Sequence, residues 1–169
     1  KGREWLEHRI RAGLPLFWDV KWKPDLKEKA DNPILLMQFA SDDTVLMLRT
    51  HHTKDLPQTI VQALRDEAVK KYTAEYTDLH QAKMQRTFDI QLGGVVELAD
   101  LARKRGLPGS TDFEAVVRRL GFTLPPDCDA VKWAGNWTPN HAKCAADCVY
   151  LSSVVFERIW SLPDLGVGG

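Results

Sequence analysis

The stretch Phe17-Trp18-Asp19-Val20-Lys21-Trp22-Lys23-Pro24 places charged residues inside an apolar run. The run begins at Leu14, and its content of aromatic and β-branched residues predicts a strand over Leu14–Trp22. Side chains two positions apart on a strand point to the same face, so Asp19 and Lys21 are expected to lie side by side. We therefore predict an ion pair between them on the first strand of the fold.

The segments after this strand alternate between strand and helix patterns. Two apolar runs of strand length, Pro33–Ala40 and Thr44–Arg49, flank the turn residues Ser41-Asp42-Asp43. From there to the C-terminus, apolar residues at helical spacing alternate with residues that favour turns and helix ends. We expect a helix from Leu56-Pro57, a weak strand over Val69–Tyr76, a helix over Leu79–Thr87, a strand end over Gln91–Val96, helices over Glu97–Lys104 and Phe113–Leu120, a loop over 122–136 and a last helix from Thr138 to about Trp160. This order predicts a mixed α/β fold in a single domain.

Length and composition favour one domain without a strong overall charge. The 169 residues are 44% hydrophobic, which suffices for one full core without metals or disulfides. Lys+Arg and Asp+Glu both number 23, whereas a dedicated nucleic-acid binder is usually basic, so any contact with RNA must be local. No apolar run approaches the roughly 18 residues of a membrane span, and we expect no membrane partner. We divide the chain into an N-terminal extension (1–13), one domain (14–162) and a flexible tail (163–169).

The cysteines are odd in number: Cys128, Cys144 and Cys148. The last two lie four residues apart in the last expected helix, a pattern that favours reduced thiols over a disulfide framework. Cys144 and Cys148 are expected to lie on a buried apolar helix face. Reduced thiols indicate an intracellular location, cytoplasmic or mitochondrial, and the sequence does not choose between the two.

Three motifs resemble the DEDD 3′–5′ exonucleases, the Werner-type domains in particular. The first strand of that family reads roughly Phe-Asp-x-Glu-Trp-x-Pro, and Asp19, Trp22 and Pro24 match it. Phe88-Asp89-Ile90 followed by Val96–Ala102, and the stretch from Asn136 to Tyr150, match without gaps. The resemblance covers about residues 14–162 and implies a ribonuclease H-like fold, in which helices flank a mixed β-sheet.

The resemblance also implies a catalytic site of four carboxylates, which hold two Mg²⁺ or Mn²⁺ ions for phosphodiester hydrolysis. This chain keeps Asp19, but Lys21 stands at the family's glutamate and His80 at the aspartate of the second motif. In the third motif Cys144 replaces the tyrosine that orients the attacking water, and Cys148 replaces the metal-binding aspartate.

The side chains at these positions predict a site without the charge for two metal ions. Asp19, Lys21, a neutral His80 and the Cys148 thiol sum to about zero, whereas hard cations need carboxylate oxygens. We therefore expect no catalytic residues, no bound metal and no cofactor.

Two alternatives remain open on the sequence. Local shifts of register could bring Asp78 and Asp147 into the site, which would then belong to an active metal-dependent 3′–5′ exonuclease acting on RNA or DNA. His80, Cys148 and Asp19 could instead supply nitrogen, sulfur and oxygen ligands to Zn²⁺.

We expect an inactive 3′–5′ exonuclease-like domain that acts as a scaffold or binding module. Its partner would be a protein or RNA within a larger assembly, such as an organellar ribosome or an RNA-processing complex. The candidate phosphate-binding residues are Lys70, Lys71, Arg103, Lys104 and Arg105. For a protein partner, the candidates for an exposed apolar patch are Trp5, Leu6, Ile10, Trp160, Leu162 and Leu165.

Overall fold

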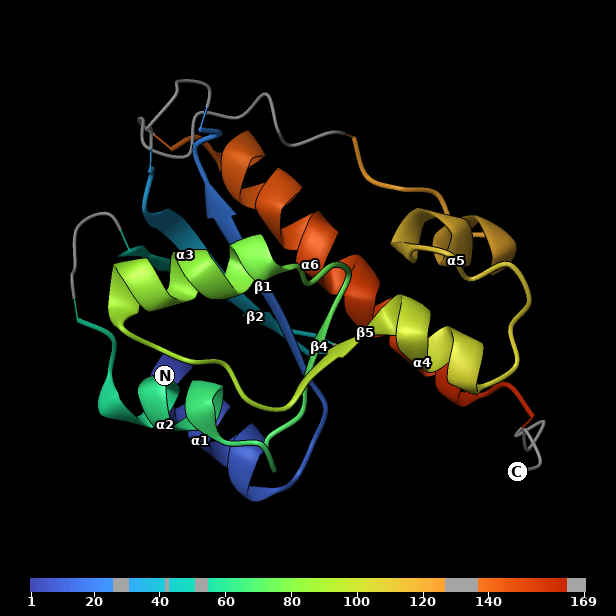
Figure 1. Cartoon of the computed structure of the whole chain (residues 1–169), viewed down its shortest axis with the longest axis horizontal. Coiled ribbons are helices and arrows are strands. Elements are labelled where there is room, and N and C mark those ends of the chain that lie inside the picture. The colour runs from blue at the N-terminus through green and yellow to red at the C-terminus, as the bar shows by residue number, and fades with distance from the viewer. Residues whose placement is uncertain (26–30, 42, 51–54, 127–136, 164–169) are drawn as a thin grey trace.

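A five-stranded mixed sheet forms the centre of the domain (Figure 1). The computed structural model describes residues 1–25, 31–41, 43–50, 55–126 and 137–163. The strands are β1 (Leu16–Trp22), β2 (Ile34–Ala40), β3 (Val45–Arg49), β4 (Lys71–Thr73) and β5 (Val95–Glu97), in the order β3-β2-β1-β4-β5. β1, β2 and β3 pair antiparallel, whereas β4 runs parallel to both β1 and β5. The expected mixed α/β fold is confirmed.

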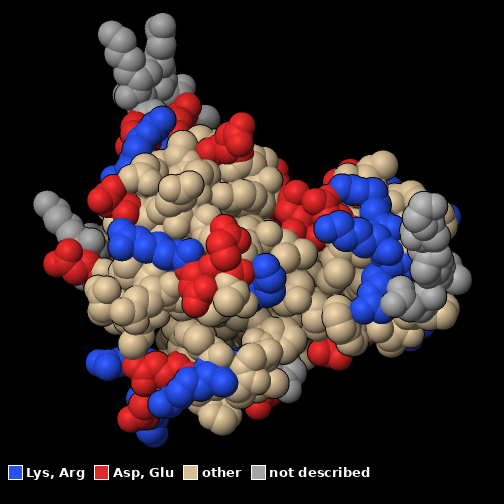
Figure 2. Space-filling view, turned by 60° about the horizontal axis from the view of Figure 1, so that its bottom comes forward, with Lys and Arg blue, Asp and Glu red and all other residues tan. Residues whose placement is uncertain are grey.

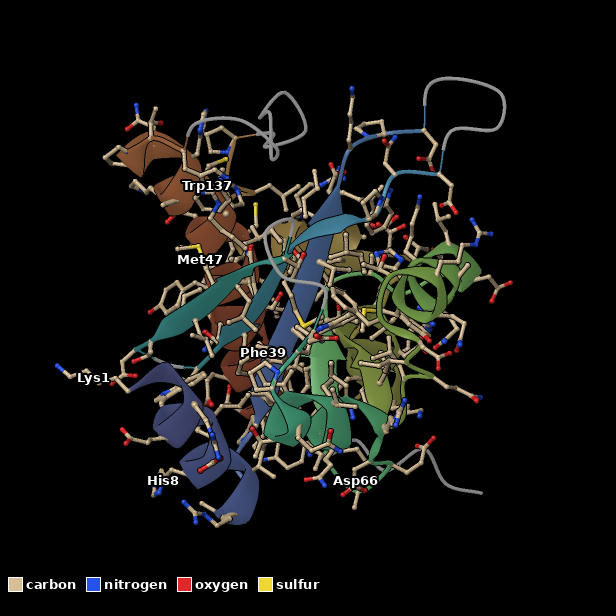
Figure 3. The ribbon with its side chains drawn as sticks, turned by 90° about the vertical axis from the view of Figure 1, so that its left-hand side faces the viewer. Lys1, His8, Phe39, Met47, Asp66 and Trp137 are labelled. Atoms are coloured by element: carbon tan, nitrogen blue, oxygen red, sulfur yellow. The ribbon has the colours of Figure 1, made fainter. Side chains whose placement is uncertain are left out.

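Helices cover both faces of this sheet. Figure 3 shows the sheet between α6 on one side and α3 on the other. The described residues form six helices, α1 (Gly2–Arg11), α2 (Gln58–Arg65), α3 (Asp78–Phe88), α4 (Leu98–Lys104), α5 (Phe113–Arg119) and α6 (Pro139–Trp160). None of the helices in the described ranges is long and apolar enough to span a membrane.

The side chains of β1 point alternately to the two faces of the sheet, and the core therefore has two layers. Leu16, Trp18 and Val20 point to one face, where they pack with residues of α1, α2 and α3. Phe17 points to the opposite face, where it packs with Phe156 and other residues of α4, α5 and α6. Asp19 and Lys21 share the face of Phe17 because the side-chain period of a strand is two. The first motif therefore lies on the side of the sheet that α6 covers.

Local sequence signals account for most helix ends. Thr138 caps α6 by accepting the His141 N–H, and Pro139 occupies the first turn, where no N–H is needed. α4 and α5 end just before Gly106 and Gly121, because both residues adopt positive φ angles that favour glycine.

Some elements differ from the sequence-based expectation, and β5 covers Val95–Glu97 instead of the strand end expected over Gln91–Val96. β4 covers only Lys71–Thr73 of the expected Val69–Tyr76, because the chain leaves the sheet to form the cap of α3 at Thr77. α1 was not expected, and its Leu6 is buried in the core with β1. Leu6 therefore cannot contribute to an exposed apolar patch, and that interpretation was wrong for this residue.

Candidate degenerate exonuclease site

The predicted ion pair on β1 is confirmed. Lys21 Nζ lies 2.9 Å from Asp19 Oδ2, and the two side chains keep only 24% and 22% of their surface exposed. The other carboxylate oxygen, Asp19 Oδ1, accepts the backbone N–H of Val20 at 2.8 Å. Both oxygens of the retained aspartate thus already have partners.

His80 lies in the first turn of α3, close to the end of β1. Its ring meets that of Trp22 edge to face, with 5.1 Å between the centroids. Its Nδ1 accepts the backbone N–H of Thr77 at 3.2 Å, which places the proton of the neutral imidazole on Nε2. The fold therefore brings the second motif beside the first.

Burial keeps this imidazole neutral. Loss of hydration lowers the pKa of His80, and the charges of Asp19 and Glu75 oppose the shift without cancelling it. At pH 7 the ring is therefore uncharged, as the charge count from the sequence assumed.

Two carboxylates near the His80 ring were not predicted from the sequence as site residues. Glu75 follows β4 and Glu97 ends β5, and the negative charges of both reach His80. Glu97 Oε1 also accepts the Tyr76 N–H at 2.9 Å. Their positions after or at the end of predicted strands could have indicated this, since the carboxyl ends of parallel strands meet at one edge of a sheet. The surroundings of His80 are therefore more acidic than the family positions alone indicate.

The third motif lies on α6, where Ala145, one of the two alanines between its cysteines, is buried. Cys144 and Cys148 pack with Ala145 against Leu35 and Leu36 of β2, as expected for an apolar helix face. Cys144 is disulfide-bonded, whereas Cys148 carries a thiol. The expectation of reduced thiols was therefore wrong for Cys144, and the inference of a reducing compartment loses that support.

The structure gives no support to a rebuilt metal site. Asp78 is exposed at the start of α3. Asp147 pairs with Lys143 one turn earlier on α6. Among the described residues, no group of three or more His, Cys, Asp or Glu side chains is arranged to hold a metal ion, which applies equally to the Zn²⁺ alternative.

The candidate phosphate-binding lysines differ in exposure. Lys71 is fully buried and donates to the carbonyl oxygens of Ala63 and Asp66 at 2.8 and 2.9 Å. Burial lowers the pKa of Lys71 to about 8. A surface role for Lys71 was therefore wrong, whereas the neighbouring Lys70 is exposed.

The other predicted basic cluster lies at the end of α4. Arg103 and Lys104 are exposed, and Arg105 is half-buried. Arg103 pairs with Asp100 and donates to the Ser110 carbonyl at 2.7 Å. Figure 2 shows Lys and Arg gathered on the lobe at the right, the side on which Figure 1 places α4, α5 and the C-terminus.

Comparisons with known proteins support the expected fold. No protein-family model matches the chain. The bifunctional 3′–5′ exonuclease/ATP-dependent helicase WRN of Mus musculus is 23% identical over 164 residues, which cover 92% of this chain. The chain spans only 12% of the length of that relative.

Two examples among the similar solved structures illustrate the shared architecture. The Nibbler EXO domain of Aedes aegypti has a TM-score of 0.73 at 17% identity, with 94% of this chain and 82% of that one covered. RNase D of Escherichia coli, an exoribonuclease involved in structured RNA processing, has a TM-score of 0.70 at 16% identity. That similarity covers 95% of this chain and 43% of the RNase D chain. The expected resemblance of fold is thereby confirmed over nearly the whole chain.

Proposed function

Since this chain has the fold of DEDD-type 3′–5′ exonuclease domains, we propose that it is an inactive exonuclease-like domain that serves as a binding module. Its partner would be a protein or RNA within a larger intracellular assembly. The residues at the family positions do not fit the two Mg²⁺ or Mn²⁺ ions of that family, so no hydrolytic step is assigned to them.

The ion pair between Lys21 and Asp19 carries this proposal. A divalent cation bound by Asp19 would lie about 4 Å from the Lys21 ammonium, and the repulsion would be about 2 kcal/mol in water and about 8 kcal/mol at an effective dielectric constant near 20. The pair is three-quarters buried, so solvent screens this repulsion only in part. A metal ion would also have to displace the ammonium from Asp19 Oδ2. Both effects weaken metal binding at the one retained aspartate.

One observation favours an active metal-dependent exonuclease as the second candidate. The carboxylates of Glu75 and Glu97 contribute negative charge near His80, outside the family's usual positions. If a substrate or partner drew them toward Asp19, three carboxylates would be available to metal ions.

The test is a titration of Mg²⁺ and Mn²⁺ with 3′-end-resolved, labelled single-stranded RNA and DNA. The wild type is expected to leave both substrates intact at every metal concentration. Trimming in the wild type that disappears in Asp19→Ala would overturn the proposal. Trimming that persists in Asp19→Ala would indicate a contaminating nuclease, which further purification must remove before the result counts.

A further inference from the structure

An aromatic column connects the core to the surface at the C-terminal end of α6. Phe17 and Phe156 are buried and meet edge to face, with 5.4 Å between their ring centroids. Phe156 stacks on Trp160 at 5.4 Å, with 18° between the ring planes. Trp160 is the last residue of α6 and is 53% exposed. The column therefore holds an indole in a fixed orientation at the surface.

A guanidinium lies on this indole. Arg105 Cζ is 4.2 Å from the centroid of the Trp160 ring, a distance typical of a cation–π contact. Arg105 caps the C-terminus of α4, directly after the exposed Lys104. The ends of α4 and α6 thus bring a rigid aromatic ring and two cations together.

Among the described residues, these helix ends carry cations that local pairing does not neutralise. Arg103 pairs with Asp100, and Arg118 pairs with Glu114. By contrast, the exposed Lys104, Arg119 and Arg158 have no carboxylate partner in the part of the chain that the structure describes.

An acidic residue of α6 opposes this charge. The exposed Glu157 lies one turn before Trp160 on α6, and hence on the same side of the helix.

We propose that the surface formed by Lys104, Arg105 and Trp160 binds single-stranded nucleic acid. Cations attract phosphates, and the exposed part of the Trp160 indole, together with the guanidinium of Arg105 that lies over the ring, offers a flat surface to unpaired bases. A duplex hides its base faces, and the carboxylates of an acidic protein have no aromatic face to stack on the indole. The inference rests on the proposed binding role but not on the loss of catalysis, because Trp160 lies about 18 Å along α6 from Cys148.

The test is fluorescence anisotropy of a labelled 12-nucleotide oligouridine with the full chain in EDTA. Trp160→Ala is expected to weaken binding about tenfold without changing the salt dependence, because stacking involves no counterion release. Lys104→Ala is expected to reduce the slope of log K against log salt by about 0.7, the value for one phosphate contact on a single strand. Trp160→Phe is expected to retain most of the affinity, since the ring is kept.

Matched controls lie on the same helix. Tyr150→Ala removes another exposed aromatic residue of α6, and Lys143→Ala removes an exposed cation near its other end. Both are expected to bind like the wild type. Glu157→Gln is expected to bind more tightly, because it removes a negative charge beside Trp160. Circular dichroism and thermal melts establish that each variant is folded.

The outcomes separate this inference from the proposed function. Absence of binding by the wild type, equal losses in the controls, or unchanged affinity in Trp160→Ala would overturn the site. Equal or tighter binding of a duplex, or displacement of the oligonucleotide by an acidic peptide at equal charge concentration, would overturn the ligand class. Because EDTA prevents metal-dependent trimming, an active nuclease would refute the inactive-domain proposal and leave this result unaffected.

Discussion

Replacement of Lys83 by methionine is expected to destabilise the domain far more than the matched change at Arg86. Both residues lie on α3, and both pair with Asp31. Lys83 is only 1% exposed, and its ammonium also contacts Asp25 at 2.7 Å and the Asn32 carbonyl at 2.7 Å. Arg86 is 58% exposed. Lys83 therefore holds both ends of the β1–β2 connection against α3, near the ring of His80.

The difference in burial between Lys83 and Arg86 determines how much free energy of unfolding each substitution removes. Removing one partner of a buried pair costs about 3–5 kcal/mol, but Asp25 and Asp31 reach water and can be rehydrated, so Lys83→Met is expected to cost about 2–4 kcal/mol. Arg86→Met removes a surface pair and is expected to cost about 0–1 kcal/mol. For a chain of this length, the larger loss corresponds to a fall in Tm of about 4–16 °C.

Urea denaturation at pH 7 and at lower pH measures both effects. Hydrogen bonds from Lys83 lower the pKa values of Asp25 and Asp31. The stabilisation is thus complete above the unfolded carboxyl pKa of about 3.9 and disappears as the pH falls through the lower folded values. Lys83→Met should lack that acid-dependent loss. Equal costs for Lys83→Met and Arg86→Met at pH 7 would refute this reasoning.

Three further predictions concern Lys71, Lys21 and His80. Because burial lowers the pKa of Lys71 to about 8, the unfolded chain binds more protons between pH 8 and the ordinary lysine value of about 10.4, and the wild-type free energy of unfolding should rise with pH in that window. Lys71→Met should lack this rise in urea denaturation at pH 7.5 and 10, and a parallel rise in both proteins would contradict the assignment. Lys21→Glu places a second carboxylate beside Asp19, so millimolar Mn²⁺ should raise the Tm of the variant by about 5–10 °C and leave the wild type unchanged. An equal shift in the wild type would show that Lys21 does not oppose metal binding. The His80 ring should titrate below its ordinary value of about 6.5 in NMR spectra, and a pKa at or above that value would contradict its burial.

Elements with strong local patterns could be predicted from sequence. The alternation in β1 fixed the shared face of Asp19 and Lys21, and the ion pair follows from that face. Thr138-Pro139 marks the start of α6 by its chemistry alone. The resemblance to exonuclease domains then supplied the expectation of one mixed sheet flanked by helices, whereas the strand order came only from the structure.

Features that depend on contacts distant in sequence could not be predicted. Nothing in the pair Lys70-Lys71 tells which ammonium turns inward, because that choice depends on the carbonyl oxygens of Ala63 and Asp66. The burial of Leu6 likewise depends on how α1 docks against the sheet. The disulfide of Cys144 requires a geometry that residue counting does not provide.

We propose above all that Asp19, paired with Lys21, does not bind the metal ions used by the exonuclease family. Isothermal titration of the wild type with Mn²⁺, with Asp19→Ala as the control, tests it most directly. We expect no saturable binding that depends on Asp19 at concentrations up to the millimolar range. Binding of two ions that Asp19→Ala abolishes would contradict the claim and identify a working metal site.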